Sequence, residues 1–223
     1  MSDKFYSLKV STEITKIGKG FPQTDGMGKG YNLRGPNSAW NIKNYAVLDF
    51  IPDLNYFNID KRAILTDFIS TAIISADGFL INDKVGHLLD DFVLTKHTYY
   101  QATLKYRNKM FSNYFWLHFT FSDDDLIDFE KSSFILTEPL PFFRTQEIHV
   151  NSKSKAEILE IWKKENSLSL FPNKIIFKPH QRQDLYSFSF LWQRHYISEN
   201  LFTRFESEKI SGIDTLIQSF TLE

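Results

Sequence analysis

Leu80-Ile81-Asn82-Asp83 and Tyr196-Ile197-Ser198-Glu199 decide the fold of this chain, because they begin the same short pattern. In each, an apolar pair is followed by Asn or Ser, then by an acidic residue, and then by apolar residues at helical spacing. Asn and Ser accept hydrogen bonds from backbone N–H groups at a helix start, and an acid stabilises the first turn. The pattern predicts a strand that leads into a capped amphipathic helix, twice.

The repeat extends on both sides of these stretches. An Asp followed by an apolar residue opens each copy, as Asp67-Phe68 and Asp184-Leu185. Apolar residues then form one helical stripe in each copy, and these are Val85, Leu88, Leu89 and Phe92 in the first and Leu201, Phe202 and Phe205 in the second. We refer to residues 67–94 as the first module and to residues 184–210 as the second module.

The composition indicates a folded protein without thiol chemistry. The chain has 223 residues, of which 42% are hydrophobic and 22 are Phe, so it can bury a sizeable core. It has no Cys, which excludes disulfides and thiolate metal sites. Its formal net charge of −1 provides no general attraction for nucleic acid or for an anionic membrane, so neither is an expected partner. With no signal peptide at Met1 and no long apolar run, the expected location is the cytoplasm.

Alternating aromatic residues predict a β-rich middle of the chain. Tyr99–Tyr106 and Phe111–Phe121 form a predicted hairpin, whose second strand is apolar on both faces and is therefore expected to lie centrally in its sheet. Further strands are predicted at Tyr45–Ile51, Ser133–Leu136, Phe142–Val150 and Lys174–Phe177. Ser154 and Glu157 have the spacing of a capping box, which predicts a helix to about Glu165. Strands and helices do not alternate regularly, so we expect an α+β fold with mixed, mainly antiparallel sheets and a few short packed helices.

Glycine marks the N-terminal part of the chain. Six of the nine glycines lie between Gly18 and Gly35, which predicts an irregular, turn-rich segment. We expect residues 1–52 to pack as a Gly-rich segment on a single compact domain formed by residues 53–223. The run Gly26-Met27-Gly28-Lys29-Gly30 lacks the spacing and the hydroxyl residue of a phosphate-binding loop. The six histidines form no metal-binding motif, so no cofactor and no metal are expected.

The modules resemble one family of bacterial proteins. The second module carries the family form in Asp184-Leu185, in Tyr196-Ile197-Ser198-Glu199-Asn200-Leu201, in Phe205 and in the following Gly212-Ile213. The first departs from it, with Asn82-Asp83 in place of Ser-Glu. Over about residues 55–217 the chain resembles the immunity proteins of polymorphic toxin systems, of the immunity family eleven and forty-three type. This resemblance implies a cytoplasmic, non-enzymatic protein that binds and blocks a cognate toxin.

An acidic cluster is the main candidate for contact with such a toxin. It comprises five carboxylates in eight residues, namely Asp123, Asp124, Asp125, Asp128 and Glu130. Clustered acids complement the basic clefts of toxins that act on nucleic acids, and they raise the rate of association. The same residues are also typical of a solvated turn in which acids stabilise a helix start, and runs of charge are more often solvated faces than binding sites.

The function expected from the sequence is therefore immunity by occlusion of a toxin, without catalysis. The alternative is an enzyme or a small-ligand-binding protein with a pocket between the two modules. A spatial arrangement of Ser, His and Asp cannot be read from sequence order, so this alternative stays open. The oligomeric state and the identity of the toxin do not follow from the residues.

Overall fold

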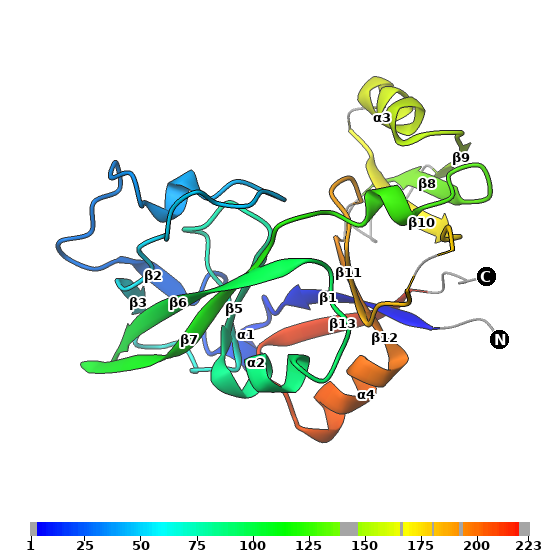
Figure 1. Ribbon diagram of the computed structural model, residues 1–223. Coiled ribbons are helices and arrows are strands. Elements are labelled where there is room, and N and C mark those ends of the chain that lie inside the picture. Colours follow the sequence, from blue (N-terminus) through cyan, green and yellow to red (C-terminus); the bar gives the residue numbers. More distant parts are fainter. Residues whose placement is uncertain (1–3, 139–146, 166, 180, 192–193, 219–223) are drawn as a thin grey trace. The chain divides into compact units, whose positions relative to one another are not determined.

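Strands make up most of the regular structure of this chain (Figure 1). The computed structural model describes residues 4–138, 147–165, 167–179, 181–191 and 194–218. These residues form three sheets, in which most neighbouring strands are antiparallel, and four short α-helices, which confirms the predicted α+β class. Contacts divide the chain into two compact units, which we describe separately. Unit 1 comprises Met1–Leu8, Ser122–Thr203 and Thr215–Glu223, and unit 2 comprises Lys9–Phe121 and Arg204–Asp214.

Unit 2 contains a six-stranded sheet with the order β2-β3-β6-β7-β5-β4. Its strands are β2 (Thr24–Met27), β3 (Phe57–Ile59), β4 (Phe68–Ile69), β5 (Gly78–Asn82), β6 (His97–Tyr106) and β7 (Lys109–Phe119). The helices of this part are α1 (Ile14–Ile17), the 3-10 turn η1 (Ala39–Asn41) and α2 (Asp83–Leu89). All pairs are antiparallel except β3 with β6.

The β6–β7 hairpin organises this sheet, as the sequence predicted. Its two-residue turn places Arg107 and Asn108 at positive φ, the conformation of the tight turns that match strand twist. Strand β7 lies between β6 and β5, and both of its faces are covered: Trp116 is 3% exposed on one face and Leu117 is 0% exposed on the other. The central position expected from its apolar faces is confirmed.

Unit 1 contains two smaller sheets. One has the order β11-β12-β1-β13 and the other the order β10-β8-β9. The strands are β1 (Phe5–Val10), β8 (Ser133–Thr137), β9 (Glu147–Asn151), β10 (Ser169–Lys174), β11 (Leu185–Ser187), β12 (His195–Ser198) and β13 (Ile213–Gln218). The helical segments are η2 (Asp124–Leu126), α3 (Lys155–Lys164) and α4 (Glu199–Ser207).

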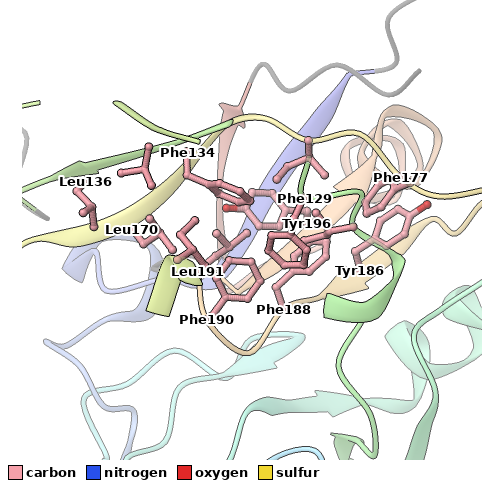
Figure 2. Packing of buried hydrophobic residues seen from close by; sticks show 14 of the residues in the cluster. Phe129, Phe134, Leu136, Leu170, Phe177, Tyr186, Phe188, Phe190, Leu191 and Tyr196 are labelled. Atoms are coloured by element: carbon pink, nitrogen blue, oxygen red, sulfur yellow. The ribbon is translucent and has the colours of Figure 1, made fainter. Parts of the chain in front are cut away.

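Figure 2 shows the aromatic core, in which Phe177 and Tyr186 stack with ring centroids 4.7 Å apart. The abundant Phe of the sequence is therefore largely core.

The first module is held by hydrogen bonds between its opening Asp and its cap. The carbonyl of Asp67 accepts from Asn82 N–H at 3.0 Å, and the Asp67 carboxylate accepts from Asn82 Nδ2 at 2.8 Å. Asn82 Oδ1 in turn accepts from the N–H of Val85 at 3.1 Å, which caps α2 as predicted. One side chain thus links the β4–β5 pair to the start of the helix.

The second module repeats this arrangement. The carbonyl of Asp184 accepts from Ser198 N–H at 2.8 Å, and its carboxylate accepts from Ser198 Oγ at 2.7 Å. Ser198 Oγ accepts from the N–H of Leu201 at 3.2 Å and so caps α4. Since the same three hydrogen bonds recur at equivalent positions, the two modules share one local structure.

Other predicted elements are confirmed, displaced or absent. The Ser154 hydroxyl caps α3 by accepting from Glu157 N–H at 3.2 Å, and α3 ends at Lys164, close to the predicted end. The strand predicted at Lys174–Phe177 is wrong, because β10 runs earlier, over Ser169–Lys174, where it pairs with β8. The strand predicted at Tyr45–Ile51 is also wrong: no strand forms there, and the apolar side chain of Val47 is 70% exposed.

The predictions for the N-terminal segment and for the strand at Phe142–Val150 agree with the structure in part. Residues 1–52 are rich in turns, but they include strand β1, helix α1 and strand β2, which pairs with β3 through Thr24 and Met27. The strand predicted at Phe142–Val150 is present from Glu147, while residues 139–146 lie outside the described residues. The boundary after residue 52 and the single domain over residues 53–223 stay predictions.

Candidate functional site

The acidic cluster begins with two buried residues. Asp123 is 7% exposed and Asp124 is 2% exposed. The Asp123 carboxylate accepts from the N–H of Ser187 at 2.7 Å and from Gln183 Nε2 at 3.1 Å. The Asp124 carboxylate accepts from the N–H of Ser189 at 2.9 Å. Asp123 therefore joins the residue before η2 to β11 and its start, and Asp124 joins η2 to the segment after β11.

Asp124 also forms an ion pair with α3. Its Oδ2 lies 2.6 Å from Lys155 Nζ, and the side chain of Lys155 is 36% exposed. The Lys155 ammonium also donates to Ser189 Oγ at 3.0 Å and lies 5.9 Å from the ring centroid of Phe190. The Asp124 carboxylate accepts from four donors, which are the Lys155 ammonium, the N–H and hydroxyl of Ser189 and the hydroxyl of Ser122. It therefore acts within the fold, because removing it leaves these donors without an acceptor.

The other three acids of the cluster face solvent to a greater extent. Asp125 and Glu130 are exposed, and Asp128 is half-buried. The Lys131 ammonium, 3.0 Å from Asp128 Oδ2, keeps the pKa of that carboxyl below its usual range. Asp125, Asp128 and Glu130 are therefore the acids of the cluster that are accessible at the surface, and the contact role assigned to all five acids stays a prediction.

A small hollow lies beside helix α2 in unit 2. It has a volume of about 160 Å³, and we call it the α2 hollow; its lining residues are Asp83, Gly86, His87, Asp90, Tyr99 and Phe115. The helix contributes the first four, and β6 and β7 contribute the two aromatic rings. Helix α2 is only seven residues long, so it covers only part of this sheet face.

The α2 hollow has acidic and aromatic character. The carboxylate of Asp83 accepts from Asn113 Nδ2 at 3.1 Å, and Asp90 is exposed. The Tyr99 hydroxyl is covered and has no hydrogen-bond partner among the described residues. Burial, together with the negative charge of Asp90, raises the pKa of Tyr99 to about 12. The hollow therefore favours positively charged groups that donate hydrogen bonds.

A larger hollow in unit 2 has the opposite charge. It measures about 710 Å³ and is lined by Asp25, Asn58, Ile59, Asp60, Lys61, Arg62, Lys105, Arg107 and Asn108. Asp60 is neutralised by ion pairs of 2.9 Å with Lys19 and with Arg62. The remaining cations extend into solvent, so this surface attracts anionic groups without a buried polar side chain to fix them.

The structure brings together a serine and a histidine that share no sequence motif. Ser187 Oγ and His195 Nδ1 lie 3.0 Å apart in the core of unit 1. Ser187 is 0% exposed, and burial lowers the pKa of His195 to about 3. A nucleophile must reach its substrate, so this buried pair is an internal hydrogen bond of the β11–β12 pair.

No family model matches the chain, and no curated protein matches it either. Within the described residues, no group of three or more His, Asp or Glu side chains is placed to hold a metal ion. No helix of these residues is long and apolar enough to cross a membrane.

Sequence reasoning did not single out the α2 hollow. Its lining combines residues that are up to 32 positions apart, Asp83 and Phe115, which only the sheet brings together. One signal was present in the repeat itself. Aligning Asp83 with Glu199 places Gly86 opposite Phe202, so the first module lacks an aromatic side chain that the second one has.

Proposed function

We propose that this protein is an immunity protein that binds a cognate bacterial toxin and occludes it without catalysis. The observation that carries the proposal is the shared geometry of the two modules. Asp67 with Asn82 and Asp184 with Ser198 form the same hydrogen bonds. These residues belong to the motif by which the chain resembles immunity proteins. The resemblance also makes the cytoplasm the proposed location.

The surface of the protein suits such a role. Asp125, Asp128 and Glu130 present carboxylates that can complement a basic cleft and accelerate association. Protein interfaces draw most of their affinity from a few residues, often aromatic residues or Arg, that fill well-packed pockets in the complex. The α2 hollow offers such a pocket in unit 2, with two carboxylates beside two rings.

Co-expression with the product of the adjacent gene tests the proposal. We expect the adjacent protein to arrest growth when produced alone, this protein to restore growth, and the two to co-purify as a complex. A neighbour that is not toxic, or one that this protein neither binds nor neutralises, contradicts the proposal.

Two matched variants then test the role of the acidic cluster. The triple variant Asp125→Asn, Asp128→Asn, Glu130→Gln removes three charges without altering shape, and we expect slower association at low salt, by roughly tenfold. The control, Asp49→Asn, removes an exposed carboxylate of unit 2 and is expected to leave the association rate unchanged. Equal rates for both variants would remove the cluster from the interface.

A further inference from the structure

In both modules, the strand that precedes the capped helix pairs with a neighbouring strand at the same position. Ile81 of β5 pairs with Phe115 of β7, and Ile197 of β12 pairs with Tyr6 of β1. Phe115 and Tyr6 therefore occupy the same position relative to their modules. On the helices that follow, Gly86 in α2 corresponds to Phe202 in α4.

The second module fills this position with its own side chain. The rings of Phe202 and Tyr6 stack with centroids 4.0 Å apart and planes inclined by 9°. Helix and strand are thus joined by an aromatic pair. In this module the ring of Phe202 covers the strand residue Tyr6.

The first module leaves the same position open. A Cβ built on Gly86 meets nothing within 4 Å, and the α2 hollow of about 160 Å³ lies over the rings of Phe115 and Tyr99. These rings meet edge to face, with centroids 6.4 Å apart. A flat group entering beside Gly86 would therefore contact an aromatic surface, as Phe202 does in the second module.

Charge and hydrogen-bonding capacity identify the kind of group that fits. Asp83 and Asp90 lie seven residues apart on α2 and both line the hollow, so its field is negative. The Tyr99 oxygen is covered, so an entering group meets the carboxylates and the faces or edges of the two rings. A guanidinium group is planar, stacks on aromatic rings, carries a positive charge and offers five N–H donors.

We propose that the α2 hollow binds an arginine side chain of the partner protein, in contact with the rings of Phe115 and Tyr99 and paired with Asp90. This inference rests on the proposed function for the identity of the partner. Size supports a single side chain, because small-molecule sites usually measure about 300–1,000 Å³, well above this hollow. Arginine fits better than lysine because the ammonium group has no flat face to stack.

A titration without any toxin tests the chemistry of the hollow. We would follow backbone amide NMR signals while adding N-acetyl-L-arginine methylamide, with the citrulline analogue as a neutral probe of the same shape. We expect shifts centred on Gly86, Asp90 and Tyr99 with arginine only, and their loss in Gly86→Leu. Absence of these shifts, equal shifts with citrulline, or shifts that persist in Gly86→Leu would overturn the inference.

Gly86→Leu is a suitable blocking variant, since the added side chain enters open space. Leucine is also a stronger helix former than glycine, so α2 should not be weakened. Circular dichroism and thermal melting would verify that the variant is folded. Asp91→Asn is the control, because Asp91 is exposed and does not line the α2 hollow.

The cognate toxin provides the second test. We expect Gly86→Leu and Asp90→Asn to weaken the complex about tenfold or more, the effect of losing one anchoring contact, and Asp91→Asn to change it less than about twofold. If the wild type binds the toxin and all three variants bind equally well, this inference fails while the proposed function stands. If the wild type does not bind, the proposed function fails and the arginine titration still decides the chemistry of the hollow.

Discussion

The first and second modules share their internal hydrogen bonds and differ in what surrounds them. Asp67 and Asp184 each bind the cap residue that starts the following helix. Asp67 also accepts from the N–H of Ser211 at 2.8 Å, and so it holds the chain just after α4 as well. The Asp–cap pair therefore builds the local structure of each module. Neighbouring residues decide which parts of the module are buried and which are exposed.

A substitution at Gly212 should have the largest effect, because Gly212 follows the second module and packs against the backbone of the first. Gly212 has a φ of +84°, and a Cβ there overlaps the carbonyl oxygen of Phe68 in β4. We expect Gly212→Ala to destabilise the protein by about 3 kcal/mol or more, since the left-handed backbone alone costs about 1–2 kcal/mol. Urea denaturation measures this loss. Gly20→Ala is the control, because its Cβ meets nothing within 4 Å; equal stability of the two variants would contradict the prediction.

The two opening Asp residues should differ in importance. Asp67 accepts from Ser211 N–H, from Ser211 Oγ at 2.6 Å and from Asn82. We expect Asp67→Ala to cost roughly 2–3 kcal/mol and Asp184→Ala roughly 1–2 kcal/mol, because Asp67 also holds the backbone N–H of Ser211. The free energy of unfolding in urea gives both values. A larger loss for Asp184→Ala would reverse the order that we infer.

Acidification should distinguish the modules, because only the second carries a buried histidine in its second strand. His195 stands where the first module has Phe79. Burial lowers the folded pKa of His195 to about 3, while the unfolded value is close to 6.5. The unfolded state therefore binds the extra proton, and the stability from this group, complete above pH 6.5, falls as the pH decreases towards 3.

The slope of this loss provides the measurement. Between about pH 6.5 and 5, one such proton contributes up to about 1.4 kcal/mol per pH unit. His118, whose pKa is also lowered by burial, acts in the same direction. We expect His195→Gln to flatten the profile by the share of one histidine, measured by urea denaturation across this range. Titration of Asp67 does not affect the slope in this pH range. Burial raises the pKa of its carboxyl, but hydrogen bonds from Ser211 and Asn82 outweigh burial and lower the pKa. The stability that Asp67 contributes is therefore lost only in stronger acid.

Exchanging the cap residues should have the smallest effect. A serine at position 82 can accept from Val85 N–H and donate to Asp67, as Ser198 does in the second module. We expect Asn82→Ser to cost less than about 0.5 kcal/mol and Asn82→Ala about 0.5–2 kcal/mol. Thermal melting would separate them. Equal losses for Ser and Ala would mean that the cap of α2 does not depend on its hydrogen bonds.

Much of the local structure followed from short-range patterns. The caps at Asn82, Ser154 and Ser198 each involve a donor three residues ahead, so their spacing is visible in the chain. The β6–β7 hairpin was predicted for the same reason, since its strands are joined by two residues. The Tyr45–Ile51 segment shows the limit of such reasoning, because an apolar run without a partner strand does not form a ladder.

The candidate site followed from the sequence only in part. The five acids are adjacent in the chain, but the sequence did not separate Asp123 and Asp124 from the three acids that face solvent. That separation depends on Ser187 and Ser189, which lie 64 and 65 residues away from the acids they bind. Burial of a carboxylate is decided by such distant donors, which no local pattern encodes.

By itself, the sequence determined the α+β class, the two modules and their caps, because these depend on propensity, alternation and hydrogen bonds between near neighbours. Only the tertiary structure decided that Phe202 is stacked on Tyr6 while Gly86 leaves the rings of Tyr99 and Phe115 open. The physical reason is that strand register joins residues far apart in the chain. Whether a position becomes filled core or an open hollow depends on what the register places opposite it.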